Sequence, residues 1–342
     1  MESYDVIIVG GGPAGLECAR ELSRFPLRVL VLEKAAVFGD KLCAGGMTLK
    51  DLKVLPLPEK LIQQKILRAA LHSRRRTAES QTPVPFVFTV DRRELGAYQR
   101  SLLDGTDVVV RTRSQVTEIG QQQLKLKTGE VFGFRYLVGA DGYASVVRRH
   151  LGLPVHRRLM GFQYTLPAKE EHSTLEMFMD ARRFHQWYAW VFPHGDTLAV
   201  GCCGDPDRIP PQKLKKGFHE WLKERSLEPG EAKLESQPIA CDYQGYRFDP
   251  IFLVGEAAGL ASGFTGEGIY QSLVSGQEVA RIIRDPAHQA DRMHQVLRYN
   301  RSLRRLMLVF QWAGPLRGSL QEVFLYLMTR TWVRNKINSL FS

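Results

Sequence analysis

The sequence has few cysteines and no pattern that would pair or cluster them. Its five cysteines are an odd number and show no C-x-x-C spacing. A disulfide framework is therefore not indicated, and neither is a zinc or iron–sulfur site. We expect free thiols and no metal.

Long apolar runs are also missing. No run reaches the roughly 18 apolar residues that a membrane span needs, and the first apolar segment lacks the basic start and cleavage site of a signal peptide. The 342 residues, 44% of them hydrophobic, are enough to bury a sizeable core in two closely packed domains. We expect a cytoplasmic protein, with association to a membrane surface as an additional expectation.

Acidic residues are scarce in the C-terminal segment, residues 292–342, which carries nine Lys or Arg against one acid, Glu322. Apolar residues recur there at helical spacing on either side of Gly314-Pro315, namely Leu303, Leu306, Val309, Phe310, Val323, Phe324, Leu327 and Met328. Basic amphipathic helices favour an anionic membrane surface, so peripheral membrane contact is one interpretation. Helices that cap a domain with a solvated basic face are the other. No nucleic-acid-binding module accompanies the charge, so we expect no nucleic acid partner.

Residues 5–33 have the pattern of a strand, a phosphate-binding turn, a helix and a second strand. The buried-strand run at 6–9 leads directly into G-x-G-x-x-G at Gly10, Gly12 and Gly15. Gly10 permits a tight turn, Gly12 lets the backbone approach a pyrophosphate, and Gly15 lets the helix pack close to the strand. The pattern therefore predicts a dinucleotide whose phosphates lie at the helix N-terminus.

The same pattern predicts an acid about 20 residues later for a ribose hydroxyl, and Glu33 closes the second apolar strand there. Two more segments have the form of a buried strand followed by a glycine-rich loop. One ends in Asp141-Gly142, and the other passes through Gly255-Glu256 to Gly268 and a helix starting near Ile269. Three separate segments of the chain thus return to the same edge of the sheet. This favours FAD over NAD, which is shorter.

The sequence pattern in the middle of the chain predicts strands at 86–90, 107–111, 115–119, 123–126 and 131–134. It also predicts a helix that starts at Asp91. Residues 160–205 alternate as strands of an antiparallel sheet, followed by a helix over 211–225. The aromatic residues Tyr188, Trp190 and Phe192 either belong to the core of this sheet or line an apolar substrate cavity.

These elements predict an α/β fold in which a Rossmann-like FAD-binding domain is interleaved with an antiparallel-sheet substrate domain. We expect the FAD-binding domain at 1–80, 91–150 and 250–285. The substrate domain is expected at 81–90 and 151–249, and basic amphipathic helices at 286–342.

The glycine-rich loop at 38–48 contains Cys43. A free cysteine is usually a small buried residue, and that interpretation stays open beside the other, a thiol next to the reactive ring of the cofactor.

Four motifs resemble those of the geranylgeranyl reductase family, within the p-hydroxybenzoate-hydroxylase-like branch of glutathione-reductase-type FAD proteins. They are K-L-C-A-G-G at 41–46, Asp91-Arg92 before a helix, Y-A-W-V-F-P at 188–193, and G-E-A-A-G with G-E-G-I between 255 and 269. The resemblance implies FAD contacts at Ala14, Gly15, Glu33, Ala44, Arg92, Val116, Glu256, Gly268 and Ile269, with Gly46 in the cysteine loop. Glu256 replaces the family's usual Asp, and Ala44 separates the cysteine from the glycine pair.

The resemblance implies an oxidoreductase that hydrogenates carbon–carbon double bonds of an isoprenoid lipid, with Cys43 as the candidate catalytic residue. The electron donor is left open between NAD(P)H and a ferredoxin-like protein, because no second nucleotide fingerprint is present. The same fold hosts FAD-dependent monooxygenases and halogenases, and a lipid- or quinone-facing electron-transfer flavoprotein is a further alternative.

Overall fold

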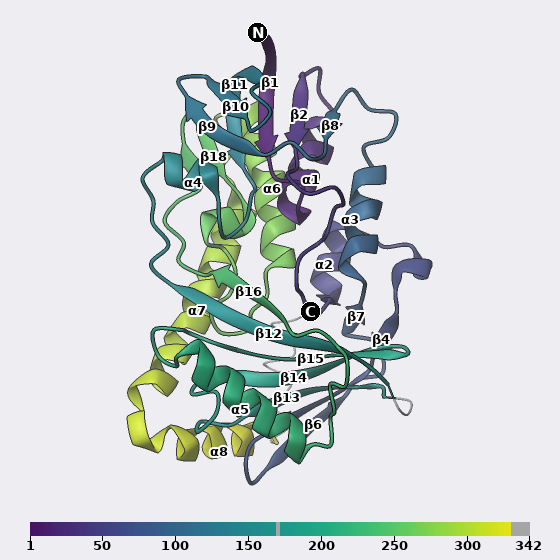
Figure 1. The fold of residues 1–342 in the computed structure, drawn as a ribbon, viewed down its shortest axis with the longest axis vertical. Coiled ribbons are helices and arrows are strands. Elements are labelled where there is room, and N and C mark those ends of the chain that lie inside the picture. The colour runs from purple at the N-terminus through teal and green to yellow at the C-terminus, as the bar shows by residue number, and fades with distance from the viewer. Residues whose placement is uncertain (169–171, 330–342) are drawn as a thin grey trace. The chain divides into compact units, whose positions relative to one another are not determined.

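The computed structural model describes residues 1–168 and 172–329. They form two compact units, each assembled from separate stretches of the chain. The first unit contains residues 1–40, 92–158 and 239–302, and the second contains 41–91, 159–238 and the stretch from Leu303 onward. Figure 1 labels the helices and strands of both.

A parallel sheet forms the centre of the first unit. β1 (Glu2–Val9) pairs with β2 (Val29–Leu32) on one side and with β11 (Val131–Gly139) on the other. β8 (Val109–Arg111) extends the sheet beyond β2, and β18 (Ile251–Leu253) extends it beyond β11. Residues 6–9 of β1 and all of β2 and β18 are apolar and buried, as expected for parallel strands that are covered on both faces.

The remaining elements of the first unit surround this sheet. The antiparallel strands are β9 (Val116–Gly120), β10 (Gln123–Leu126) and β17 (Arg247–Phe248). The helices are α1 (Pro13–Leu22), α3 (Arg92–Ser101), α4 (Val146–His150), the short η2 (Gly255–Ala258), α6 (Ile269–Arg284) and the first part of α7 (Asp291–Trp312).

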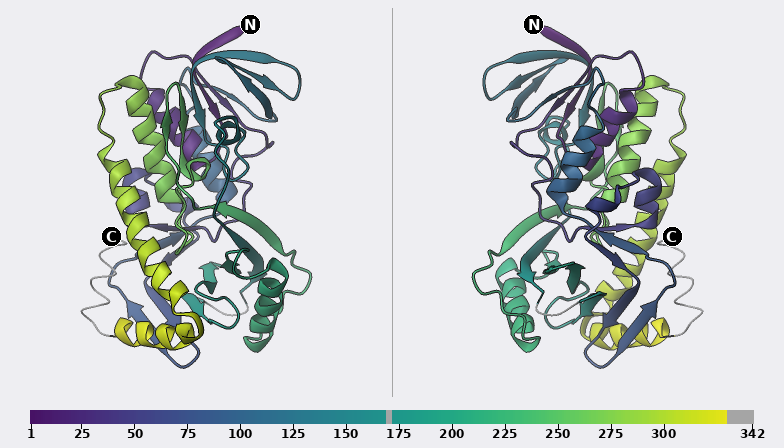
Figure 2. Two further views of the ribbon diagram at one scale, coloured as in Figure 1. Left: turned by 90° about the vertical axis from the view of Figure 1, so that its left-hand side faces the viewer. Right: turned by 90° about the vertical axis from the view of Figure 1, so that its right-hand side faces the viewer.

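Helices α1 and α6 pack against each other with little space between them. A Cβ atom at Gly276 of α6 would lie 2.4 Å from the backbone oxygen of Ala14, so only glycine permits this approach. Figures 1 and 2 show the two helices side by side.

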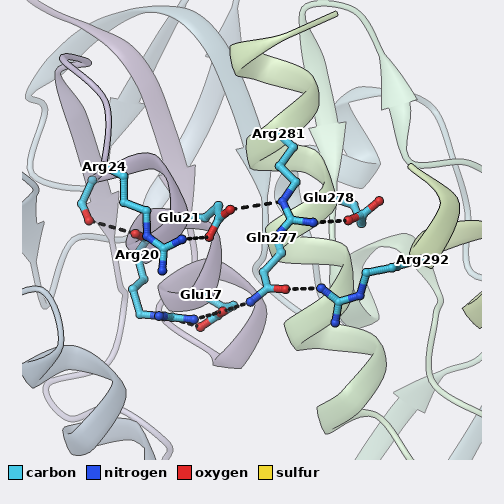
Figure 3. A network of polar contacts seen from close by, with 9 residues as sticks. Glu17, Arg20, Glu21, Arg24, Gln277, Glu278, Arg281 and Arg292 are labelled. Carbon is cyan, nitrogen blue, oxygen red and sulfur yellow. Dashed lines mark hydrogen bonds and ion pairs between the residues drawn. The ribbon is translucent and has the colours of Figure 1, made fainter. Parts of the chain in front are cut away.

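A polar network continues along the interface of α1 and α6 (Figure 3). Glu17 and Glu278 are 1% exposed, and each has an arginine of its own helix beside it. Arg281 also reaches across to Glu21 of α1 at 3.1 Å, and the Gln277 amide donates to Glu17. Buried carboxylates cost free energy unless they are paired, and here each is paired. The network therefore holds α6 in register with α1, whose first turn is the predicted phosphate site.

Two sheets form the second unit. The larger has the order β16-β12-β15-β14-β13-β5-β6 and the smaller has the order β3-β7-β4. The strands of the larger sheet are β5 (Arg68–His72), β6 (Thr77–Gln81), β12 (Arg158–Pro167), β13 (Thr174–Met179), β14 (Tyr188–His194), β15 (Thr197–Gly204) and β16 (Glu235–Ala240). The other elements are β3 (Gly46–Thr48), α2 (Leu49–Val54), η1 (Glu59–Leu61), β4 (Gln64–Ile66), β7 (Val87–Thr89), α5 (Pro211–Glu224), the end of α7, η3 (Gly314–Leu316) and α8 (Arg317–Met328).

The larger sheet has one fully buried face. Ala189 and Val191 of β14 point to a core that also contains Phe218 and Trp221 of α5. The intervening residues Tyr188, Trp190 and Phe192 are only half-buried and point to the opposite face. The run β12-β15-β14-β13 is antiparallel as expected, and so is the pair β5-β6, whereas β13 and β5 run parallel.

The division between the units differs from the domain boundaries expected from the sequence. Residues 41–80 were expected with the nucleotide domain, but β5 pairs with β13 and β6 pairs with β5, so this stretch belongs to the second unit. The pairing joins strands about a hundred residues apart, which local patterns do not reveal. The expected helix at Asp91, the strands between 86 and 134, and the helix over 211–225 are all present.

The C-terminal segment is helical where the structure describes it, and residues 330–342 of the expected basic segment lie outside the described residues. Some of the apolar residues expected on the helix faces are buried and others are exposed. Phe310 is buried, whereas Val309, Val323 and Leu327 are exposed. Within residues 1–168 and 172–329, no helix is both long enough and apolar enough to cross a membrane.

Candidate functional site

The three glycines of the first turn have the geometry that their spacing predicts. Gly10 has φ +108°, and a Cβ there would lie 2.4 Å from the backbone oxygen of Ala140. A Cβ at Gly15 would lie 2.0 Å from the backbone oxygen of Gly10, so the helix can approach the strand only without a side chain. A Cβ at Gly12, by contrast, would have no neighbouring atom within 4 Å. The turn is therefore tight at Gly10, closely packed at Gly15 and open at Gly12, where a pyrophosphate would approach.

The N-terminus of α1 has no side-chain cap. Gly12 is its N-cap residue, Pro13 occupies the first turn, and no acidic side chain lies in that turn. The amides at this end keep their capacity to bind an anion, and the helix dipole favours one there.

Glu33 follows β2 and faces the same turn. Its carboxylate accepts hydrogen bonds from the Gly11 amide at 2.6 Å and from the Ala35 amide at 2.8 Å. Because a carboxylate can accept about four hydrogen bonds, capacity remains for a ribose hydroxyl. The amide of Ser114, two residues before Val116 in β9, donates to the Glu33 backbone oxygen, which fixes the start of β9 beside Glu33.

Two predicted cofactor residues carry buried polar atoms that lack a partner within the protein. Asp141 accepts a hydrogen bond from the Val146 amide through Oδ2, but its Oδ1 is buried and unpaired. Burial raises the pKa of this carboxyl, although its hydrogen bonds act in the opposite direction. Arg92, at the start of α3, likewise has a buried and unpaired Nη1. Buried polar groups are normally satisfied, so both atoms point to a ligand that supplies the missing partners.

The third segment lies against the first turn of α1. Gly255 has φ +56°, and a Cβ there would lie 2.9 Å from the Ala14 Cβ. Glu256 accepts a hydrogen bond from the Ala240 amide at 3.0 Å, which fixes its carboxylate. Gly268 caps α6 without a side chain, immediately before Ile269, so a second uncapped helix N-terminus belongs to this unit.

The structure adds a residue that the sequence patterns did not single out. Gln271, in the first turn of α6, is 1% exposed, and neither its side-chain oxygen nor its nitrogen has a partner. Its position three residues after Gly268 could be read from the sequence, but its burial could not.

In the second unit, the cysteine loop packs against the end of β14. A Cβ at Gly46 would lie 2.7 Å from the Phe192 ring, and the Ala44 backbone oxygen lies 2.9 Å from His194 Nε2. Because a carbonyl oxygen only accepts, the ring donates this bond through Nε2, and burial lowers the pKa of His194. The Gly45 amide lies 3.4 Å from Cys43 Sγ and holds the half-buried thiol in place.

Gln163 of β12 connects Cys43 to the aromatic residues. Its amide nitrogen lies 3.3 Å from the Cys43 backbone oxygen, and its oxygen accepts from Trp190 Nε1 at 3.3 Å. Gly201 of β15 lies between Gln163 and Trp190 in the strand register, and its missing side chain makes room for the indole. The structure therefore places Cys43, Trp190 and Phe192 on one half-buried face, with Tyr188 6.2 Å from Trp190 between ring centroids.

The first unit fits FAD by these tests: an open approach at Gly12, two uncapped helix N-termini, and unpaired buried atoms on Asp141 and Arg92. All predicted cofactor residues belong to this unit except Ala44 and Gly46, which lie in the cysteine loop of the second unit.

Comparison with known proteins agrees with this geometry. Residues 1–73 match the Thi4 family. The geranylgeranyl diphosphate reductase of Rhodobacter capsulatus is 28% identical over 308 residues, which cover 81% of this chain and 74% of that protein.

Two solved structures share the fold. A geranylgeranyl bacteriochlorophyll reductase-like protein from Thermoplasma acidophilum has a TM-score of 0.79 at 19% identity, covering 97% of this chain and 92% of its own. A probable FAD-dependent monooxygenase from Pseudomonas aeruginosa has a TM-score of 0.71 at 17% identity. The match covers 95% of this chain and 100% of the monooxygenase chain. These findings confirm the expected fold class and the resemblance read from the motifs. The chain is similar to geranylgeranyl reductases over most of its length, and it is an FAD-dependent oxidoreductase.

Proposed function

We propose that the protein hydrogenates carbon–carbon double bonds of an isoprenoid lipid. The similarity to a reductase named for geranylgeranyl diphosphate over 81% of the chain carries this proposal. FAD, once reduced by NAD(P)H or a ferredoxin-like donor, would supply the hydride for one alkene carbon, and a proton would complete the other.

The residues of the first unit would bind and orient this cofactor. The amides at the start of α1 would hold the pyrophosphate, Glu33 a ribose hydroxyl, and Arg92, Asp141, Val116, Glu256 and Gly268 the remaining polar and apolar parts. Glu33, Asp141 and Glu256 already accept hydrogen bonds from backbone amides, so their carboxylates need little rearrangement on binding.

The half-buried face of the second unit suits an apolar chain. Trp190 pairs across the strands with Met177, and Tyr188 pairs with Met179, so aromatic and thioether groups alternate on this face. The rings and thioethers contact an isoprenoid by dispersion, and the Trp190 N–H is already donated to Gln163. This geometry supports the substrate-contacting interpretation for Tyr188 and Trp190. Phe192 instead packs against a small core cluster of Ile66, Val87 and Leu175, which supports the core interpretation for that residue.

Cys43 is the residue proposed to assist proton delivery. Isolated alkenes accept hydride poorly, so a positioned acid would lower the barrier. Replacing Cys43 with Ala is expected to leave bound FAD unchanged and to lower turnover by about 100-fold. The flavin content of the purified protein measures bound FAD. The rate at which the anaerobically reduced enzyme converts a geranylgeranyl lipid measures turnover.

Cys203→Ala is the matched control, because it removes a thiol from the same unit outside the cysteine loop. Wild-type turnover in the Cys43 variant would remove the thiol from the mechanism and leave the FAD and substrate assignments in place.

We also propose peripheral contact of a cytoplasmic protein with a membrane through residues 292–342, because an isoprenoid lipid substrate would be reached from the bilayer surface.

A further inference from the structure

Helix α8 presents an apolar face to solvent. Leu316, Val323, Tyr326 and Leu327 are exposed and recur at intervals that place them on one side of the helix. The opposite side carries the buried Gln321 and Leu325, so the exposed side is not the one that packs on the unit. Trp312, at the end of α7, is 83% exposed, and Leu316 is 70% exposed. Large apolar groups gathered in this way mark an interaction site.

An arginine-rich turn lies beside this face. Arg74, Arg75 and Arg76 form the exposed turn between β5 and β6, a run to which the sequence patterns assigned no role. Figure 2 shows α8 alongside the hairpin formed by these strands.

Specific contacts fix the turn to the helix. Glu322 of α8 accepts hydrogen bonds from the Ser73 hydroxyl at 2.9 Å and from the Arg75 amide at 3.1 Å. The Arg76 guanidinium lies 5.3 Å from the centroid of the Tyr326 ring. The apolar face of α8 and the arginine turn therefore form one continuous surface, which we call the α8 surface.

The charge of the α8 surface is almost entirely positive. Residues 74–76 and 303–329 contain six arginines and a single acid, Glu322. Glu322 lies 3.7 Å from Arg76 and offsets one of the six arginine charges, so the surface stays strongly positive. An anionic partner complements this charge, and the exposed tryptophan and leucine require a partner with an apolar interior.

We propose that the α8 surface docks on an anionic phospholipid bilayer. Helix α8 lies in the plane of the interface, Trp312 and Leu316 enter the acyl region, and the arginines at 74–76 contact lipid phosphates. The inference rests on the proposed function only in that a lipid substrate gives the contact a purpose. It extends the membrane contact proposed for residues 292–342 by adding the β5–β6 turn, which lies more than 200 residues earlier in the chain.

Vesicle binding tests the proposal without substrate or turnover. The purified holoprotein is sedimented with phosphatidylcholine vesicles, with and without about 30% phosphatidylglycerol, over a range of salt concentrations. Binding is expected only with the anionic vesicles and is expected to weaken with salt. The triple variant R74Q/R75Q/R76Q is expected to bind about 100-fold more weakly, since each arginine contributes roughly a factor of five. W312S/L316S is expected to lose about 100-fold as well.

Two control variants test whether the loss of binding depends on where the side chains lie or only on how much charge and apolar surface is removed. K215Q/K216Q/K223Q removes the same charge from exposed positions of α5, and L67S/V84S removes exposed apolar side chains of the same unit. Both are expected to bind like the wild type. Equal losses in the controls, or no preference of the wild type for anionic vesicles, would overturn the proposal.

Size-exclusion chromatography over a concentration range gives an independent outcome. A dimer that W312S/L316S abolishes would assign the α8 surface to a second copy of the chain and would also overturn the proposal. Vesicle binding without reduction of any isoprenoid would instead refute the proposed function and leave the docking surface standing.

Discussion

Replacing Gly12 with Ala is expected to weaken FAD binding severely while leaving the fold intact. The added methyl group would meet no protein atom within 4 Å, so the turn itself accommodates it. It would occupy the space through which a pyrophosphate approaches the backbone, and we expect the affinity to fall by about 100-fold, equivalent to about 2.7 kcal/mol. Fluorescence titration of the apoprotein with FAD measures this loss.

Gly15→Ala is expected to behave differently, although the chemical change is the same. Its methyl group would lie 2.0 Å from the Gly10 backbone oxygen, so α1 must move away from β1. Overpacking of this severity costs about 3 kcal/mol, and both the stability of the apoprotein and FAD binding should fall. Gly120→Ala is the control, because its new methyl would find its nearest neighbour at 3.5 Å, an ordinary contact.

Thermal unfolding of the apoproteins distinguishes the effects of the two substitutions, because only the Gly15 variant is expected to lose stability. A Gly12 variant that binds FAD like the wild type would place the pyrophosphate elsewhere. A Gly15 variant as stable as Gly120→Ala would show that the helix does not depend on close contact with the turn.

The second large effect is expected at the buried ion pair of Arg148 and Asp242. The two side chains are 3% and 7% exposed and lie 2.9 Å apart. Arg148 also donates to the backbone oxygens of Leu153 and Pro154, and Asp242 accepts from the His156 amide at 2.6 Å. Removing either partner leaves an uncompensated buried charge, which typically costs about 3–5 kcal/mol.

Arg148→Met and Asp242→Leu are therefore each expected to destabilise the protein by about that amount in denaturant unfolding followed with saturating FAD. The double variant should be more stable than the sum of the single changes predicts, because an apolar pair leaves no buried charge. Arg149→Met is the control, since this neighbouring side chain is exposed. Strict additivity, or single variants within about 0.5 kcal/mol of the wild type, would show that solvent screens this pair.

This ion pair also supports the third cofactor segment. A Cβ at Gly259 would lie 2.7 Å from the Asp242 backbone, so the turn after Gly255-Glu256 packs directly on the segment that the pair holds. FAD affinity should therefore fall together with stability in the Arg148 and Asp242 variants.

The tight turn of residues 10–15 could be predicted from the sequence because part of what constrains it is local. Gly15 is constrained by the Gly10 backbone oxygen five residues earlier, and the position of Glu33 follows from the length of one helix and one strand. Gly10 is also constrained by Ala140, which follows the distant strand β11. The half-buried position of Trp190 was harder to predict. The alternation of residues along β14 shows that the strand has two faces but not which of them is covered by α5.

Non-local pairing accounts for most of what the sequence did not reveal. Residues 41–80 join the second unit through β5 and β13, and no local pattern records that partnership. Gln163 and Gln271 appear in the sequence as ordinary polar residues, and only the fold shows that both are buried. On α7, helical spacing grouped Val309 with Phe310, whereas the packing exposes one and buries the other.

The central claim is that reduced enzyme passes its electrons to an isoprenoid double bond. The most direct test is to reduce the purified holoprotein anaerobically, add a geranylgeranyl lipid, and follow flavin absorbance and product mass together. We expect reoxidation of the flavin without oxygen, with two hydrogen atoms gained by the lipid for each double bond reduced. A flavin that stays reduced until oxygen is admitted, followed by an oxygenated product, would contradict the reductase assignment and establish a monooxygenase.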